Sequence, residues 1–269
     1  MRLIVNADDF GLSETINAGV ARACREGIVT SASLMAGGPA FGDALTLVDE
    51  LPELGVGVHL TLAAGTAVCP PPAAPTLVAE DGSLPAGIGA FAGRFFSGAI
   101  ALADVAAELE AQVGRVVDAG VRVTHLDSHR HVHNFPGVAG VVVDAARRFG
   151  VGAVRFCRCR IWPPGRGWLG RQVVLRLWAE GFGARALGAG LKMPDGLEGQ
   201  EYAGSLDAAK LRALIGKLGA GTWELLCHPA EEAPGGKFDR GGELAALTAA
   251  VVRAELEERG VKLINFAAL

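Results

Sequence analysis

The sequence predicts an α/β fold in which parallel strands and helices alternate and form a complete or distorted (β/α) barrel. Short apolar runs alternate with longer segments of helical periodicity along most of the chain, a pattern typical of a parallel sheet. About seven or eight such units fit into a chain of this length. Because half of the 269 residues are hydrophobic, one barrel-sized domain can bury a large core, and we expect a single domain over residues 1–269.

The first part of the chain contains three short apolar runs that predict strands. The third run, GVGVHLTL, alternates with period two, as a half-buried strand does. Ser13 belongs to a residue type that caps helices, and Glu14 in the first turn favours a helix that ends near Gly27. The predicted strands are 3–6, 31–35 and 55–62, and the predicted helices are 13–27 and about 39–49.

The segment from about residue 63 to residue 100 is rich in proline and glycine. It contains three consecutive prolines, Pro70 to Pro72, and the turn-forming pair Asp81-Gly82. This length is too great for an ordinary connection between two elements of a compact domain. We therefore expect a lid or a substrate-binding loop here.

Regular alternation resumes after this loop. The helix predicted over 104–119 places Val105, Leu109, Val113 and Val116 on one face, and the strand after it leads into a cluster of histidines. The predicted helices of this part are 104–119, 135–149, 168–181, 206–218 and 243–259, and the predicted strands are 121–127, 153–156, 222–227 and 262–266.

Composition and charge exclude several classes of protein. A net charge of -4 and a pI near 5.9, with arginines dispersed except over 155–171, predict no nucleic-acid partner. The sequence has no stretch of about 18 apolar residues and begins without a signal-peptide pattern, so we expect a cytoplasmic protein without a membrane span. Five cysteines without paired zinc-module spacing are expected to be reduced and mostly buried.

Candidate catalytic residues follow four of the predicted strands. Asp8 and Asp9 come after the first strand, His59 lies near the end of the third, and His228 follows strand 222–227. Four of the six histidines, together with an aspartate, fall in HLDSHRHVH, residues 125–133. Active sites of (β/α) barrels lie at the C-terminal ends of the strands, so these side chains are expected to meet there. Carboxylates beside imidazoles suggest a divalent-metal hydrolase.

Each of these residues also has a structural explanation. An Asp-Asp pair at a strand end can form a turn or cap a helix. A single histidine such as His59 on an alternating strand is usually a hydrogen-bonded core residue. The joint placement of aspartates and histidines at four strand ends favours catalysis or metal binding over these explanations.

Four motifs, in this order, resemble the YdjC/ChbG family of carbohydrate deacetylases. They are NADDFG at 6–11, GVHL at 57–60, THLDSHRHVH at 124–133 and CHP at 227–229. Each motif alone is weak evidence, but their joint occurrence is specific. The resemblance extends from the first strand to at least Pro229 and therefore covers most of the chain.

The resemblance implies a barrel-like fold, a bound divalent metal and hydrolysis of the N-acetyl group of an amino sugar. By motif position, the metal ligands correspond to Asp9, His59 and His129. Asp8 then corresponds to the general base, by analogy with the Asp-Asp pair of NodB-type deacetylases. His228 is the candidate general acid, because an amide nitrogen must be protonated before it leaves.

Other residues near these motifs are candidates for substrate contact or for orienting the ligands. His125 and Asp127 share the period of His129 along the strand, so all three are expected to face the barrel mouth or its core. One of His131 and His133 is expected to contact sugar while the other is structural. Arg155, Arg158 and Arg160 could contact sugar or form a solvated basic stretch. Trp162 and Trp168 could stack on a sugar ring or simply pack against the protein.

Several alternatives stay open at the level of sequence. The resemblance favours magnesium, whereas a set of two imidazoles and one carboxylate favours zinc, which we place second. The substrate is expected to be a chito-oligosaccharide such as diacetylchitobiose, or an N-acetylglucosaminyl lipid of the hopanoid type. A phosphoesterase that uses Asp8, Asp9 and Asp127, or a sugar-binding protein without catalysis, are the alternative functions. Relatives of this type are often dimers, so a homodimer is expected from the resemblance.

Overall fold

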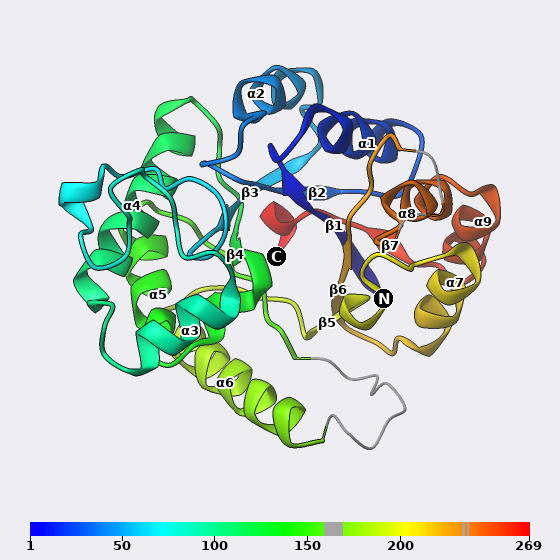
Figure 1. Ribbon diagram of the computed structural model, residues 1–269. Helices are drawn as coiled ribbons and strands as arrows, with labels where there is room; N and C mark the ends of the chain where they lie inside the picture. Colours follow the sequence, from blue (N-terminus) through cyan, green and yellow to red (C-terminus); the bar gives the residue numbers. More distant parts are fainter. Residues whose placement is uncertain (159–168, 233–234, 236) are drawn as a thin grey trace.

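The computed structural model describes residues 1–158, 169–232, 235 and 237–269, and within them a parallel sheet curls into a barrel-like shape with helices around it (Figure 1). The strands are β1 (Arg2–Phe10), β2 (Ser31–Leu34), β3 (Gly55–Leu60), β4 (Leu126–Ser128), β5 (Gly196–Glu198), β6 (Thr222–Cys227) and β7 (Lys262–Leu263). The α-helices are α1 (Glu14–Arg25), α2 (Phe41–Glu50), α3 (Ile88–Phe96), α4 (Leu102–Asp118), α5 (Val138–Arg148), α6 (Leu169–Gly188), α7 (Ala208–Lys217), α8 (Arg240–Leu247) and α9 (Ala250–Glu258). Short 3-10 helices are η1 (Pro71–Ala73), η2 (His129–Asn134), η3 (Gln200–Tyr202) and η4 (Phe266–Ala268).

The sheet has the order β4-β3-β2-β1-β6-β5, and its neighbours pair in parallel. The short strand β7 pairs with the start of β1, at Arg2 and Leu3. Parallel neighbours place all strand C-terminal ends on the same side of the sheet. The predicted (β/α) architecture is therefore confirmed, and its candidate residues share one side.

The predicted strand 153–156 forms single bridges instead of a continuous ladder. Leu126 N of β4 donates to Ala153 O over 3.1 Å, and Val154 N donates to Lys192 O over 2.9 Å. Further along, Leu197 N of β5 donates to Arg158 O over 3.0 Å. This segment thus connects the two edges of the curled sheet, which makes the barrel distorted.

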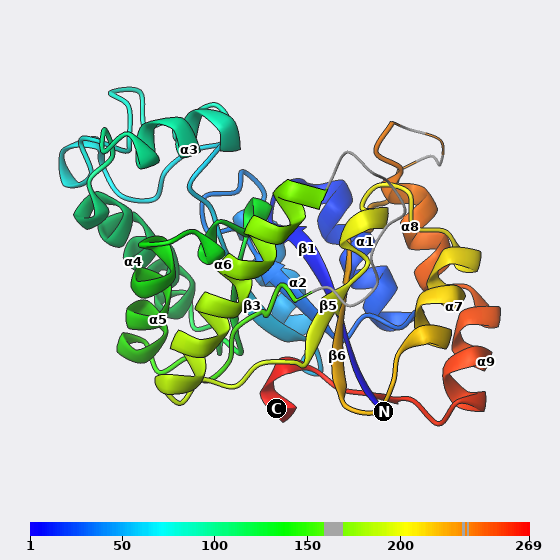
Figure 2. The same ribbon diagram turned by 90° about the horizontal axis from the view of Figure 1, so that it is seen from below.

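The C-terminus lies beneath the barrel. Figure 1 shows η4 at the centre of the ring of helices, and Figure 2 shows it at the lower end, on the side of the N-terminus. Phe266 of η4 is 1% exposed and stacks on the imidazole of His125 at a centroid distance of 3.8 Å. The lower end of the barrel is therefore filled by aromatic packing, and the opposite end carries the strand C-termini.

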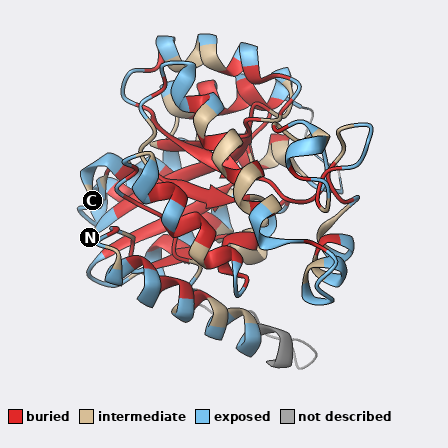
Figure 3. Cartoon of the chain, turned by 90° about the vertical axis from the view of Figure 1, so that its left-hand side faces the viewer, coloured by how far each residue is buried: buried red, intermediate tan, exposed pale blue. Residues whose placement is uncertain are grey.

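Local sequence signals explain most element boundaries. Ser13 caps α1 through its Oγ, which accepts from Ile16 N over 3.2 Å, and Arg22 and Arg25 lie in the last turn, where cations favour a helix. Apart from β7, the strands are almost wholly buried, whereas the helices expose their outer faces (Figure 3). This burial pattern follows from the continuous apolar runs that a parallel sheet covered by helices requires.

Several boundaries differ from the sequence-based expectation. The segment 63–100 contains η1, α3 and an antiparallel bridge between Thr66 and Ser83, and it stands on the side of the strand C-termini (Figure 2). The helix predicted over 243–259 is broken between α8 and α9, and the strand predicted over 121–127 is reduced to β4. The structure adds β5, where no strand was expected from the sequence. Among the described residues, no helix is long and apolar enough to cross a membrane.

Gly57 on β3 is expected to tolerate no larger side chain. A Cβ there would lie 2.4 Å from Cε1 of the buried His125 ring, which Phe266 holds from the other side. We expect Gly57→Ala to lower the free energy of unfolding by about 1–3 kcal/mol, as overpacked cores do. Urea unfolding measures this change in the free energy of unfolding. The control is Gly181→Ala in α6, where a Cβ meets nothing within 4 Å and helix propensity should add up to about 1 kcal/mol; equal effects would contradict the packing argument.

Candidate active site

The predicted residues meet at the C-terminal side of the barrel. Asp8 and Asp9 lie near the end of β1, His59 lies near the end of β3, and His129 begins η2 directly after β4. His228 follows β6. The neighbouring strand positions explain this convergence, because β3 and β4 pair with His59 opposite Asp127, two residues before His129.

The backbone at Asp9 departs from regular strand geometry. Its φ of 65° lies in the left-handed region, which is strained for a residue with a side chain, and the register of β1 with β2 shifts between Ala7 and Phe10. Adjacent residues of a regular strand point to opposite faces. The irregularity at Asp9 breaks this alternation, so that one oxygen of Asp8 and one of Asp9 lie 3.8 and 3.6 Å from His59 Nε2.

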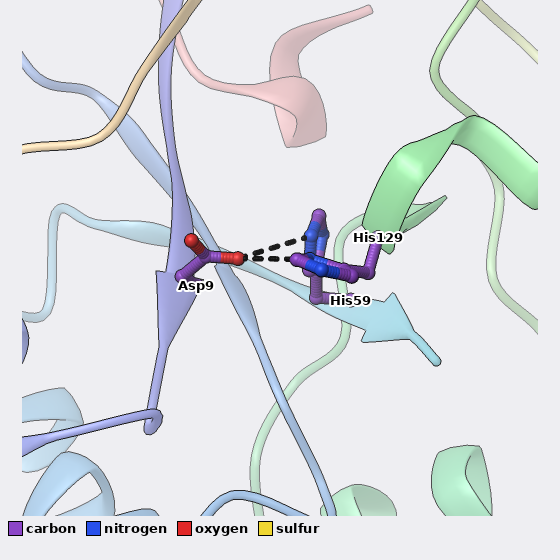
Figure 4. Close-up of side chains that lie close together, drawn as sticks. All are labelled: Asp9, His59 and His129. Carbon is purple, nitrogen blue, oxygen red and sulfur yellow. Dashed lines mark hydrogen bonds and ion pairs between the residues drawn. The ribbon is translucent and has the colours of Figure 1, made fainter. Parts of the chain in front are cut away.

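Three side chains form a candidate metal-binding group. Asp9 Oδ1 lies 3.1 Å from His129 Nδ1 and 3.6 Å from His59 Nε2, so both imidazoles converge on one oxygen (Figure 4). Two atoms bound at about 2.1 Å to one ion at the tetrahedral angle lie about 3.4 Å apart. The observed separations match this value, and the donor set of one carboxylate and two imidazoles fits a divalent transition metal.

Electrostatic surroundings keep Asp9 ionised. Burial alone would raise the pKa of Asp9, but the hydrogen bond with His129 and the charges of His59 and His228 hold this pKa well below its usual value. Its second oxygen, Oδ2, accepts from Arg240 Nη2 over 2.6 Å. Asp9 therefore offers Oδ1 alone to a metal ion.

Asp127 fixes the orientation of His59. Its Oδ1 lies 2.9 Å from His59 Nδ1, which leaves Nε2 as the free ring nitrogen on the side of Asp9. Burial would lower the pKa of His59, but the charges of Asp127 and Asp8 outweigh it and raise this pKa to about 9. Without a metal, the His59 ring is thus an imidazolium at neutral pH.

Arg155 is the cation around which the buried carboxylates are arranged. From the sequence, Arg155 was expected either to contact sugar or to be solvated. Its side chain is instead fully buried inside the barrel. It binds both oxygens of Asp8, over 2.6 and 2.8 Å, and one oxygen each of Asp127 and Glu224, over 2.7 and 2.8 Å. Burial by itself would lower the pKa of Arg155, but these three carboxylates raise it well above its usual value. Arg155 therefore orients Asp8 and Asp127 from below the site.

A second possible metal-binding group consists of Asp8, His59 and Asp127. Its two carboxylates are already paired with Arg155, and Nδ1 of His59 is already paired with Asp127. A dication placed among them would face the guanidinium at short range. The group of Asp9, His59 and His129 has the better chemistry for a metal.

His228 is held by Glu243 of α8. Glu243 is fully buried, and its Oε2 accepts from His228 N over 2.6 Å while its Oε1 accepts from Gly204 N over 2.5 Å. The same Oε2 lies 3.8 Å from His228 Nδ1, a buried atom without a hydrogen-bond partner among the described residues. The ring of Phe238 meets the His228 ring edge to face at 5.2 Å. His228 is thus positioned at the site through its backbone and its ring face.

Two further histidines of the cluster have structural partners. His125 lies below the site, where its ring nitrogens contact Ser33 Oγ and Thr124 Oγ1, and burial lowers its pKa to about 3. His133 is fully buried and contacts Ser128 Oγ over 2.6 Å and Cys157 Sγ over 3.3 Å. One of His131 and His133 was expected to contact sugar, and both ring nitrogens of His133 already contact protein atoms.

His131 is only partly buried, whereas His125 and His133 are fully buried. It lies in the left-handed backbone region, with φ of 57°, and its Nδ1 lies 3.4 Å from Cys157 Sγ. Burial, the largest cause, lowers the pKa of His131 to about 3, so the ring is neutral. Contact between His131 and a sugar stays a prediction.

Some sequence-based candidates lie elsewhere. Arg158 is exposed and pairs with Glu180 over 3.2 Å, as expected of a solvated arginine. Arg160, Trp162 and Trp168 lie outside the described residues.

Sequence reasoning missed Glu224, Glu243 and Arg240. Glu224 had a detectable signal, since it is the single charge in the otherwise apolar strand TWELLC; burial raises its pKa to about 7. No comparable local signal marks Glu243 or Arg240.

Comparison with known proteins agrees with this geometry. A family profile described as YdjC-like protein matches residues 2–258. A carbohydrate deacetylase from Geobacillus stearothermophilus is 36% identical over 274 residues, which cover 98% of this chain and 96% of that protein. A chitooligosaccharide deacetylase from Salmonella schwarzengrund is 35% identical over 273 residues, which cover 98% of this chain and 97% of that protein.

Solved structures share the fold. The crystal structure of a proposed cellobiose-phosphate cleavage protein from Enterococcus faecalis is 26% identical, with a TM-score of 0.80 over 99% of this chain and 98% of that one. A lactam utilization protein from Thermus thermophilus shares the fold at a TM-score of 0.51 and 17% identity, over 98% of this chain and 99% of that one. Because the family profile spans nearly the whole chain and both sequence relatives share more than a third of its residues, the chain belongs to the YdjC-like family.

Proposed function

We propose that this protein is a metal-dependent deacetylase that removes the N-acetyl group of an amino sugar. The observation that best supports this proposal is that Asp9, His59 and His129 converge on one point, with Asp8 and His228 beside them. Family membership supports the reaction class, because the two sequence relatives named above are deacetylases of carbohydrates.

Asp9 Oδ1, His59 Nε2 and His129 Nδ1 would hold the metal. When bound, a divalent ion lowers the pKa of water and polarises the acetyl carbonyl, which is the chemistry that amide hydrolysis requires. Two imidazoles among three ligands are acceptable to zinc, cobalt or manganese and are poor ligands for magnesium by softness, whereas the family resemblance favours magnesium. Restoration of activity by one of these ions after chelation would distinguish them.

Asp8 is suited to take a proton from water. A carboxylate has about four acceptor positions, and Asp8 uses three of them, two for Arg155 and one for Asn6 Nδ2 over 2.9 Å. The remaining position is on Oδ2, the oxygen 3.8 Å from His59 Nε2. The unused acceptor of Asp8 therefore lies next to the metal-binding group, where a water molecule would be activated.

His228 is suited to protonate the leaving amine. It interacts electrostatically with Asp9 and directly follows β6, the strand next to β1. Glu243 accepts from the backbone N–H of His228, and its Oε2 lies 3.8 Å from Nδ1, which places a negative charge beside the imidazole. An amine leaves an amide only after protonation, so an acid beside the metal-binding group completes the set.

The alternative functions receive less support. A two-metal phosphoesterase would need the second group, but Arg155 occupies its carboxylates. A sugar-binding protein without catalysis would have no use for both Asp8 and His228 beside the ligands. Whether the sugar is a chito-oligosaccharide or lipid-linked, whether the protein forms a homodimer and whether it is cytoplasmic stay predictions.

Metal-dependent acetate release is the first expected outcome. We expect no acetate from N-acetylglucosamine, diacetylchitobiose or longer chitin oligomers after chelation, and restored release with magnesium, zinc or cobalt, because the chemistry needs the ion. An enzymatic acetate assay measures this. Absence of release from every substrate with the ion bound would shift support to a lipid-linked amino sugar or to the alternative functions.

Asp8→Asn is expected to separate catalysis from metal binding. The amide keeps the size of Asp8 but cannot accept a proton, so kcat should fall by about 10²–10⁴-fold. Metal affinity, measured by calorimetry, should fall far less than after loss of a ligand, because Asp8 is not among the three converging ligands of Asp9, His59 and His129. His129→Ala is the matched control that should lose the metal. A fully active Asp8→Asn protein would remove Asp8 from the mechanism.

Metal binding is expected to release a proton from His59. The pKa of His59 is raised to about 9 in the metal-free protein, and a metal binds only the neutral ring. The ring is therefore protonated below about pH 9 and must lose its proton when the metal binds. The apparent affinity for the metal should thus rise by up to about tenfold per pH unit from pH 7 to pH 9 and then level off. Calorimetry at pH 7 in buffers of different ionisation enthalpy should count about one released proton; a count near zero would contradict the raised pKa.

A further inference from the structure

Arg240 is a second guanidinium at the site, and no role was expected for it from the sequence. It is the first residue of α8 and is 16% exposed. Its Nη2 donates to Asp9 Oδ2 over 2.6 Å, and its Cζ lies 4.9 Å from the centroid of the Phe238 ring. The guanidinium group is therefore held at one edge by the carboxylate of Asp9 and on one face by the ring of Phe238.

The other terminal nitrogen of Arg240 lacks an acceptor. Nη1 is buried and has no hydrogen-bond partner within the described part of the chain. A guanidinium stays charged at any physiological pH, so this N–H group cannot avoid the cost of burial by losing a proton. A buried donor left unsatisfied is unfavourable, and an acceptor supplied by a ligand would remove the penalty.

The position of Nη1 limits what this acceptor can be. Nη1 and Nη2 are bonded to the same carbon, so an oxygen bound by Nη1 lies next to Asp9. This is the reacting end of the substrate and not a distant part of it. Because the charge of Arg240 is already balanced by Asp9 at 2.6 Å, the ion pair as a whole is neutral and suits an uncharged acceptor such as a hydroxyl oxygen.

Phe238 connects Arg240 to His228. The ring of Phe238 meets the imidazole of His228 edge to face and lies under the guanidinium of Arg240. Phe238 is itself held against Gly204, where an added Cβ would lie 2.4 Å from the ring, and it is still 42% exposed. One partly open aromatic ring thus sets the positions of the proposed acid and of the unsatisfied donor.

We propose that Arg240 binds the substrate, with Nη1 donating to a hydroxyl of the same sugar ring that carries the scissile acetamido group. This inference rests on the proposed deacetylase function and deepens it, because it assigns recognition of that ring to one residue. Arg240 also keeps Asp9 Oδ2 occupied, so that Oδ1 faces the metal. Nη1 thus binds the sugar, and Nη2 holds Asp9.

The Arg240→Lys variant tests whether Arg240 binds the sugar in addition to holding Asp9. Lysine keeps a positive charge opposite Asp9 but has no second donor fixed in a plane. We expect KM for the N-acetylated sugar to rise by about tenfold or more, with kcat and metal affinity each within about threefold of the wild type, as loss of one hydrogen bond to a charged donor implies. Steady-state kinetics and metal calorimetry give the three values. Arg212→Lys, an exposed arginine of α7 paired with Glu255, is the matched control and should change none of them.

A series of monodeoxy analogues of the sugar makes the test independent of how the variant folds. In the wild type, removal of the one hydroxyl that Nη1 binds should raise KM by about tenfold. In Arg240→Lys, the same analogue should be no worse than the parent sugar.

Three results would overturn the inference while the proposed function stands. An unchanged KM in Arg240→Lys, or equal KM values for all analogues in the wild type, would show that Nη1 binds no hydroxyl. A loss of metal affinity that accounts for the whole effect would show that Arg240 acts through Asp9 alone. If the wild type deacetylates none of the sugars, the proposed function itself fails, and this inference fails with it.

Discussion

The buried guanidinium of Arg155 is the constraint on which the rest of the site depends. It lies inside the barrel and binds Asp8 of β1, Asp127 of β4 and Glu224 of β6, so that it connects strands far apart in the sequence. Buried carboxylates without a counter-charge would be protonated or would destabilise the fold. Arg155 supplies the counter-charge for these buried carboxylates, and its hydrogen bonds fix the direction of Asp8 and Asp127.

The candidate metal-binding group depends on these ion pairs. Asp127, held by Arg155 and by Ser33 Oγ over 2.8 Å, orients His59, and the ring of His59 then presents Nε2 to Asp9. The left-handed backbone at Asp9 brings its carboxylate to the same point as the one from Asp8. Strain of this kind persists only where surrounding contacts enforce it, and here Arg240 holds the second oxygen of Asp9.

Two polar residues of α8 link the outer layer of the barrel to the chemistry. Glu243 accepts from the backbone of His228 and of Gly204, and Arg240 binds Asp9 while it stacks on Phe238. A helix of the outer layer that packs against α1 and α7 therefore positions both the proposed acid and a proposed metal ligand. The proline-rich segment 63–100, with α3, stands on the same side of the barrel, where it can shape access to the site (Figure 2).

The sequence by itself determined the alternation of strands and helices and the placement of Asp8, Asp9, His59 and His129 at strand ends, because apolar periodicity and short motifs are local properties of the chain. It also indicated the cap at Ser13 and the whole of β6. Only the tertiary structure decided that Arg155 is buried, that His125 and His133 have protein partners at both ring nitrogens, and that Glu224, Glu243 and Arg240 contact the candidate residues or their partners. These assignments depend on pairs separated by many residues, such as Arg155 with Asp8 and Arg240 with Asp9, and such contacts exist only after the barrel has formed.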